Sequence, residues 1–338
     1  MSAPTRRQVA GYLGALAALT AGAAWAPRPS AGRERLVVVG GGPAGAAAAL
    51  ALKRASASVL LVERDPKGLG RAGASAFDRP GGGPGLAALR RAGVEVILDE
   101  AVGVHWADQR LALFSGRVLA FDRLFLAPGT AARPEAIPGL DPAARHLWPA
   151  AWGSAREARR LSAQLAALPD RPHVILRLPD GLSPRHAVLD RAHHLARRLD
   201  RTRPGARLTV LDAATATDDA ARWQSLRAAE GGSTAVDWRP AGQGGTVVGV
   251  DARRGVVETA AGRLVADAVN FIETQGAGTI ARTAGLVDAS GWCPTDPHGR
   301  SLTHPQAAIL GDARKDAART VAGALRSGLA AAGGALNA

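Results

Sequence analysis

The sequence is poor in cysteine, tyrosine and lysine, and each shortage excludes a class of protein. Cys293 is the only cysteine among 338 residues, which excludes an intrachain disulfide and any cysteine-based metal cluster. Lysine occurs only at Lys53, Lys67 and Lys315, one tyrosine is present, and no basic run alternates with aromatic residues. We therefore interpret the net charge of +13 mainly as a compositional excess of arginine, and we expect no nucleic-acid partner.

The remaining composition is that of a folded chain. Hydrophobic residues make up 47% of the sequence and charged residues 21%, which indicates a globular rather than a disordered protein. The length is sufficient for about two domains with a sizeable core.

The first 26 residues have the pattern of an export signal. Arg6 and Arg7 precede a weakly hydrophobic run, and Ala24–Trp25–Ala26 offers a small-x-small cleavage site. The alternative is a membrane anchor, but the run is short and contains few Leu, Ile and Phe residues. The pattern predicts a twin-arginine signal peptide over 1–26, cleavage after it, a periplasmic location and no stable membrane anchor afterwards.

A complete dinucleotide fingerprint follows the export signal. An apolar strand over 36–39 enters a Gly-x-Gly-x-x-Gly turn over 40–45, and a helix-forming run leaves it. The first glycine permits the tight turn, the second lets the backbone approach a pyrophosphate, and the third lets the helix pack on the strand. A second strand, over 58–62, ends on Glu63, where an acid binds a ribose hydroxyl. The alternative is a glycine-rich turn without a function. The predicted contacts here are Gly40, Gly42, Pro43, Ala44, Gly45, Glu63 and Arg64.

A later strand predicts the other side of this site. After a loop over 65–85, the pattern indicates a helix over 86–91, a strand over 94–98 and an antiparallel meander near 101–119. An apolar strand then ends in Ala-Pro-Gly, which would put small residues against a cofactor, although an ordinary buried strand and turn would have the same pattern. The predicted contacts are Val102, Ala127 and Gly129.

A second β-α-β unit, within 151–265, has nucleotide-binding architecture without the binding loop. Its expected strands lie at 173–176 and 207–211, with a helix between them at 186–199. The turn over 178–183 has one glycine, so its backbone should not close on a second pyrophosphate.

Hairpin strands follow near 246–265, and we expect a strand over 268–272 to return to the first sheet. His193 and His194 are neighbours on the predicted helix and do not share a face. Because no third ligand has useful spacing, we interpret them as surface histidines and predict no metal site.

The last informative stretch is an apolar strand over 307–310 that ends in Gly311–Asp312 before the final helix. The Asp312 carboxylate could accept a hydrogen bond from a sugar alcohol, and amides at a helix N-terminus would face a phosphate or ring. The sequence therefore predicts an α/β fold with two Rossmann-like, three-layer domains. These are a discontinuous dinucleotide-binding domain over 33–150 and 266–330, and an inserted domain over 151–265.

The order of these features resembles the two-dinucleotide-domain flavoproteins and, among them, the flavoprotein subunit of flavocytochrome c sulfide dehydrogenase. The matching motifs are Ala-Gly-Leu through Gly-Trp-Cys-Pro-x-Asp over 284–296, the Ala-Pro-Gly ending at Gly129, Ala151–Trp152, and the twin-arginine leader. The likeness extends from about residue 6 to residue 325, and Gly-Trp-Cys-Pro is its most specific motif.

The resemblance implies FAD at the first glycine turn and sulfide oxidation through a cysteine pair beside the flavin, with electrons passed to a c-type cytochrome. Cys293 matches one cysteine of that pair, but its partner would fall near Ser183 and is absent. The family's cysteine that links covalently to FAD would lie within 65–85 and is also absent, so we expect noncovalent FAD. Only 26 residues (338 − 312) follow Asp312, so we expect the family's C-terminal interface domain to be largely missing.

Two hypotheses follow from the sequence. The first is an exported FAD-dependent oxidoreductase of the sulfide dehydrogenase type, which serves electron transport. The second is an exported FAD-binding accessory protein without sulfide turnover. Flavin bands that sulfide bleaches would favour the enzyme, and stable flavin bands would favour the accessory protein.

Overall fold

The computed structural model describes residues 34–336 apart from 56–57, 67–68, 70–81 and 216–217. The expected signal peptide over 1–26 and most of the loop over 65–85 lie outside the described residues. No helix of the described part of the chain is long and apolar enough to cross a membrane.

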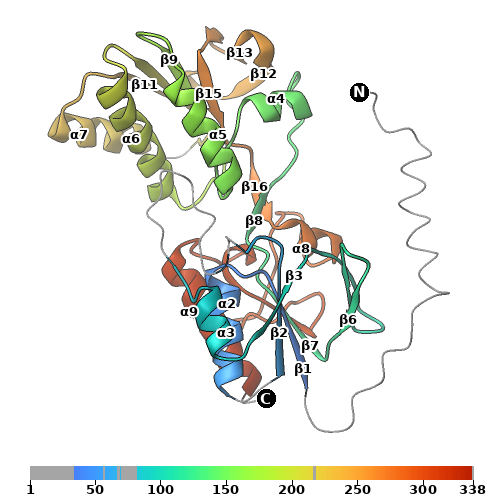
Figure 1. Ribbon diagram of the computed structural model, residues 1–338. Helices are drawn as coiled ribbons and strands as arrows, with labels where there is room; N and C mark the ends of the chain where they lie inside the picture. Colours follow the sequence, from blue (N-terminus) through green and yellow to red (C-terminus); the bar gives the residue numbers. More distant parts are fainter. Residues whose placement is uncertain (1–33, 56–57, 67–68, 70–81, 216–217, 337–338) are drawn as a thin grey trace. The chain divides into compact units, whose positions relative to one another are not determined.

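A five-stranded parallel sheet forms the first domain, with strand order β17-β7-β1-β2-β3. Figure 1 labels four of these strands, β1, β2, β3 and β7. Strand β1 is central because its Leu-Val-Val-Val run is buried and pairs in parallel on both sides, with β2 and with β7. The strands are β1 (Arg35–Val39), β2 (Ser58–Glu63), β3 (Glu95–Leu98), β7 (Arg123–Leu126) and β17 (Ala307–Ile309).

Each face of this sheet is covered by a different kind of layer. Helices pack on one face, where Val38, Leu61 and Phe125 belong to one apolar cluster. An antiparallel meander and a short helix cover the other face, where Val37 and Leu124 belong to a second apolar cluster. The helices are α2 (Pro43–Arg54), α3 (Leu86–Arg91) and α9 (Val321–Leu336), and the second layer contains β4 (Ala101–His105), β5 (Arg110–Leu113), β6 (Val118–Ala120) and α8 (Thr279–Thr283).

Helices α2 and α9 pack closely because small residues line their contact. A Cβ on Gly328 of α9 would lie 2.2 Å from the carbonyl oxygen of Ala44 on α2. Pro43 opens α2 at its first position, where the missing N–H costs nothing.

The second domain repeats the three-layer arrangement with a four-stranded parallel sheet, in the order β11-β10-β9-β15. Its strands are β9 (His173–Leu178), β10 (Arg207–Asp212), β11 (Ala235–Pro240) and β15 (Ala268–Phe271). One face is covered by α5 (Ala155–Ala166), α6 (Arg185–Thr202) and α7 (Asp219–Glu230). The other is covered by α4 (Pro142–Leu147) and the hairpin strands β12 (Val247–Asp251), β13 (Val256–Thr259) and β14 (Gly262–Val265).

Two antiparallel strands, β8 (Thr130–Ala132) and β16 (Gln275–Ala277), connect the domains. Three short 3-10 helices complete the described elements, namely η1 (Ala241–Gln243), η2 (Ala252–Arg254) and η3 (Gly311–Ala313).

The expectation that the strand at 268–272 returns to the first sheet is wrong. Strand β15 pairs in parallel with β9 of the second sheet, from Ala268 opposite Val174 to Phe271 opposite Arg177. All four of its residues are buried, because the helix layer and the hairpin layer cover this sheet on both faces. The chain returns to the first domain through β16, and β17 is the strand that completes the first sheet.

Candidate dinucleotide site

The predicted glycine turn connects β1 to α2 and leaves no room for side chains. Gly40 has a φ of +93°, and a Cβ on it would lie 2.2 Å from the carbonyl oxygen of Ala127. A Cβ on Gly45 would lie 1.9 Å from the carbonyl oxygen of Gly40. The turn is therefore as tight as the fingerprint predicts, and it directs the first amides of α2 towards the carboxyl edge of the sheet.

Glu63 lies beside this turn at the end of β2. Its two carboxylate oxygens accept hydrogen bonds from the backbone amides of Gly41, at 2.5 Å, and Asp65, at 2.8 Å. The carboxylate is thus held at the turn with lone pairs left for a ribose hydroxyl.

The other predicted contacts divide into those near the turn and those elsewhere. Gly311 is adjacent to α2, because a Cβ on it would lie 3.0 Å from the Cβ of Ala44. Gly129 has open space on its Cβ side. Arg64 forms an exposed ion pair with Glu100 at 3.1 Å, and Val102 lies on β4 with 43% of its surface exposed. The contacts of all these residues with a cofactor stay predictions.

Asp312 shows that the site fits a ligand with hydroxyl groups. One of its carboxylate oxygens, Oδ1, is buried and has no hydrogen-bond partner. Burial raises the pKa of this carboxyl, and the charge of Arg319 opposes the shift. A buried acceptor without a donor is costly, and a ribityl or ribose hydroxyl would satisfy it. The tight turn, the fixed acid Glu63 and the unpaired acid Asp312 therefore fit FAD.

Arg319 was not identified from the sequence, although it lies close to Asp312. Its guanidinium stacks on the Trp292 ring, 3.7 Å from the ring centroid, and its Nη1 donates to Ser183 Oγ at 3.0 Å. Burial lowers the pKa of Arg319, and the carboxylates of Asp312 and Asp316 oppose that shift. No local pattern identifies this residue, because Trp292 and Ser183 come from two distant segments of the chain.

Cys293 is located in the core and not on an accessible surface. Its exposed fraction is 0%, and its backbone bonds to Ala313 and Lys315. Burial, and then the charge of Asp288, raises the pKa of the thiol to about 12. Desolvation therefore disfavours the thiolate at this position.

An ion triad of two buried aspartates and one partly exposed arginine occupies the nucleotide edge of the second domain. Asp212 ends β10 as Glu63 ends β2, but its Oδ2 accepts from Arg185 Nη2 at 2.7 Å. Nε of the same arginine donates to Asp219 on α7 at 2.6 Å. The exposed fractions of the two aspartate side chains are 0% and 2%. The acid that would bind a ribose is thus neutralised by the chain itself. Its position directly after the strand expected at 207–211 is the signal in the sequence that could have identified it.

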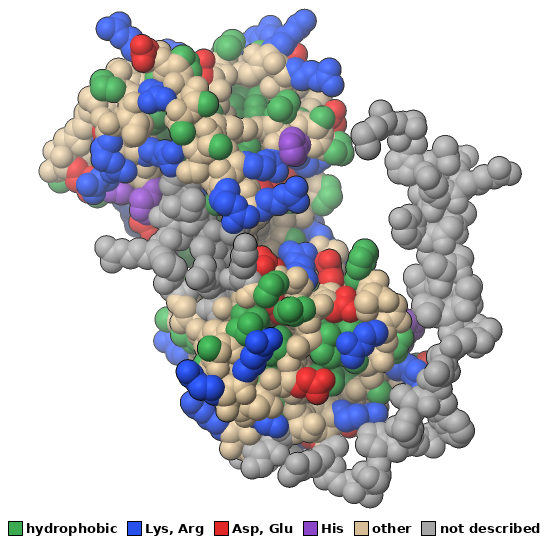
Figure 2. All heavy atoms as spheres, in the orientation of Figure 1, with side chains coloured by type: hydrophobic (Ala, Val, Ile, Leu, Met, Phe, Trp, Pro, Cys, Tyr) green, Lys and Arg blue, Asp and Glu red, His purple; other side chains and the backbone are tan. Residues whose placement is uncertain are grey.

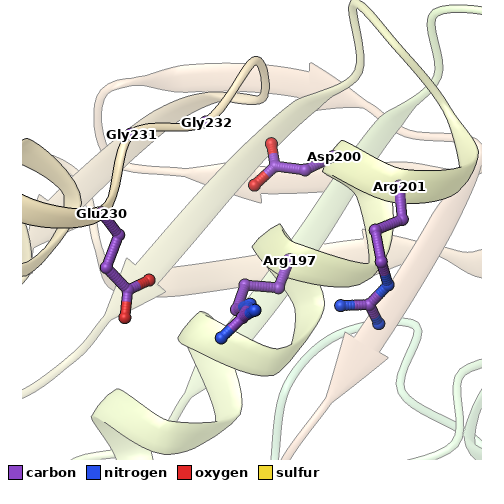
Figure 3. A pocket seen from close by; sticks show the side chains of 6 residues that line it. All are labelled: Arg197, Asp200, Arg201, Glu230, Gly231 and Gly232. Carbon is purple, nitrogen blue, oxygen red and sulfur yellow. The ribbon is translucent and has the colours of Figure 1, made fainter.

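A hollow of about 440 Å³ lies at the opposite edge of the second sheet (Figure 3). It is lined by residues at the ends of α6 and α7, next to the starts of β10 and β11, whereas a nucleotide binds at the carboxyl ends of such strands. Acidic and basic side chains both face it, and Asp200 is paired with Arg227 at 2.9 Å. Its lining residues are Arg197, Asp200, Arg201, Glu230, Gly231 and Gly232.

Basic side chains are spread over the visible face of the molecule, as Figure 2 shows.

His193 and His194 are half-buried on α6, with Nδ1 of His193 3.4 Å from Glu230 Oε2. Within the described residues, no group of three or more His, Cys, Asp or Glu side chains could hold a metal ion.

The chain has an α/β fold with two parallel-sheet, Rossmann-like domains, and this fold matches that of solved FAD/NAD(P) oxidoreductase structures. Residues 34–167 match the family model described as pyridine nucleotide-disulphide oxidoreductase. This match includes the glycine turn, Glu63 and the Ala-Pro-Gly segment.

Solved structures share this fold at low sequence identity. The chain is similar to reduced Bacillus anthracis CoADR-RHD, with a TM-score of 0.67, 18% identity, and coverage of 90% of this chain and 57% of the other. For Lactococcus lactis thioredoxin reductase the TM-score is 0.61, the identity 18%, and the coverage 90% and 98%. For a ferredoxin reductase from Rhodopseudomonas palustris the values are 0.65, 18%, 90% and 76%. The chain therefore spans less than two thirds of the Bacillus anthracis chain.

Proposed function

We propose that this chain is an exported FAD-dependent oxidoreductase that takes electrons from a sulfur compound and passes them to a c-type cytochrome. The observation that carries the FAD assignment is the unpaired Asp312 carboxylate beside a glycine turn that excludes side chains. Members of the family that residues 34–167 match bind FAD. The sulfur donor and the cytochrome are proposed from the Gly-Trp-Cys-Pro motif and its resemblance to the sulfide dehydrogenase flavoprotein.

The described residues have separate roles at this site. Gly40 and Gly45 bring the backbone close to a pyrophosphate, Glu63 binds a ribose hydroxyl, and Asp312 accepts a hydroxyl proton in a hydrogen bond. Bound FAD supplies the two-electron redox chemistry. We propose that it is held noncovalently, because the sequence has no cysteine within 65–85 to link it.

The buried thiol favours direct reaction of the sulfur compound with the flavin over a cysteine pathway. A pair of cysteines would allow sulfide to open a disulfide by exchange, but Cys293 is alone and fully buried. The same observation favours the second candidate, an exported FAD-binding accessory protein without sulfide turnover.

One spectroscopic experiment separates these functions. Protein purified from an expressing cell should show flavin absorbance bands, and acid precipitation should release the flavin into the supernatant. Anaerobic sulfide should bleach the bands, and added cytochrome c should restore them as its haem becomes reduced. Bands that sulfide leaves unchanged would support the accessory protein, and a preparation without flavin would overturn both candidates.

The export proposal has its own test. The periplasmic protein should begin close to Pro27, and the change of Arg6 and Arg7 to Lys should trap the precursor in the cytoplasm. Unimpeded export of the Lys variant would contradict a twin-arginine signal.

A further inference from the structure

Two oppositely charged side chains lie together at the candidate site, and each has a buried polar atom without a partner. These atoms are Oδ1 of Asp312 and Nε of Arg319. Their charges influence each other, yet among the described residues no hydrogen bond or close ion pair joins the two groups. The chain therefore holds a free acceptor and a free donor near each other and does not use one to satisfy the other.

The Arg319 guanidinium is fixed in place by several contacts. It stacks on Trp292, and Nη1 donates to Ser183 Oγ at 3.0 Å and to the carbonyl oxygen of Ala317 at 3.3 Å. Nη2 donates to the carbonyl oxygen of Arg314, also at 3.3 Å. Only Nε remains for a ligand. Its position is fixed because Nη1 and Nη2 of the same guanidinium already donate hydrogen bonds.

Arg319 also has an unusual backbone conformation, with a φ of +49°. A non-glycine residue in the left-handed region costs free energy, and such residues cluster at functional sites. Arg319 lies two residues before the start of α9 and in the segment that follows Asp312. The Arg319 cation and the Asp312 carboxylate lie close enough for each charge to affect the pKa of the other.

We propose that Asp312 binds a hydroxyl donor and Arg319 a ring acceptor of the bound FAD, and that the Arg319 cation raises the reduction potential of the flavin. This inference rests on the FAD binding proposed above. FAD offers hydroxyl donors for Asp312 and ring acceptors for Arg319, and the flavin gains negative charge when it accepts two electrons and one proton. A fixed cation in a half-buried site stabilises the more negative, reduced form.

The test compares the reduced-to-oxidised flavin ratio of variants at one poised potential, with dithionite as the reductant. In Arg319→Gln we expect at least a tenfold lower ratio, about 30 mV for two electrons. Asp312→Asn, which removes a negative charge, should shift the ratio in the opposite direction. Lys315→Gln is the matched control, because it removes the same charge from an exposed side chain paired with Asp288. Its ratio should stay within about twofold of the wild type, as expected for a screened surface charge.

The outcomes distinguish this inference from the proposed function. A wild-type protein without flavin would contradict the FAD assignment itself. A flavin-loaded Arg319→Gln protein with an unchanged ratio, or an equal shift in Lys315→Gln, would overturn the role of Arg319. If Arg319→Gln does not fold, Ser183→Ala removes the shorter of the two Nη1 hydrogen bonds, and its ratio should fall at least threefold. An unchanged ratio in Ser183→Ala would then overturn the inference.

Discussion

Arg185 forms ion pairs with two buried carboxylates of the second domain. Its removal tests how much these pairs contribute to stability. Arg185→Ala leaves Asp212 and Asp219 buried without a counter-charge, and we expect the free energy of unfolding to fall by about 3–5 kcal/mol. The control is Arg222→Ala, which breaks an ion pair with Asp218 whose side chains are 60% and 65% exposed. That change should cost at most about 1 kcal/mol. Urea denaturation of both variants measures the difference, and equal small losses would contradict a buried triad.

The Cys293 thiol makes stability depend on alkaline pH. Its folded pKa of about 12 lies above its ordinary value of 9.0, so the unfolded chain loses this proton first as the pH rises. The stabilising contribution is complete below pH 9.0 and is lost between pH 9.0 and 12.

A Cys293→Ala variant should therefore show a shallower alkaline loss of stability than the wild type. The slopes should differ by up to about 1.4 kcal/mol per pH unit. Chemical denaturation at several pH values measures both slopes, and parallel curves would show that the thiol is accessible in the folded protein.

At the scale of elements, strong periodicity explains what the sequence could predict. The helix expected at 86–91 is α3, and the strand expected at 173–176 is the amino-terminal part of β9. The pattern at 268–272 does not identify the sheet to which this strand belongs, because a fully buried parallel strand has the same pattern in either sheet. Loop closure and strand order decide between the sheets, and neither leaves a local signal.

The candidate site was predictable to the extent that its residues belong to one motif. The glycine turn and Glu63 lie within 24 residues (40–63), and the fingerprint places them together. Arg319, Ser183 and Trp292 meet through the topology of the chain, so sequence spacing gave no indication of them.

Helix α9 offers a matched pair of glycines that tests the helix contact beside the site. A Cβ on Gly328 would lie 2.2 Å from the backbone of Ala44, whereas a Cβ on Gly333 meets nothing within 4 Å. Gly328→Ala should lower the free energy of unfolding by about 1–3 kcal/mol through overpacking. Gly333→Ala should raise it by about 0.5–1 kcal/mol, because alanine restricts the unfolded chain. Thermal denaturation checks both signs, and stabilisation by Gly328→Ala would contradict the close packing of α2 and α9.

At the scale of the whole molecule, two similar sheets differ at their nucleotide edges. The first keeps a glycine turn and an acid held by backbone amides, whereas the second has one glycine, Gly181, and an acid paired with Arg185. A pyrophosphate needs close backbone approach, and a ribose needs an acid with free lone pairs. Only the first sheet meets both needs among the described residues. In the proposed function, electrons should therefore reach the flavin from a donor that requires no second nucleotide site.

We therefore expect NADH and NADPH to be poor reductants of the bound flavin. In stopped-flow mixing, either nucleotide at millimolar concentration should leave the oxidised flavin bands nearly unchanged over seconds, while dithionite bleaches the same sample. Dithionite is the necessary control because it needs no binding site, and its reaction shows that the flavin is accessible and redox-active. Rapid bleaching by NADH would mean that the Arg185 triad opens in solution. It would also favour a nicotinamide-dependent disulfide reductase over an enzyme that takes electrons from a sulfur compound.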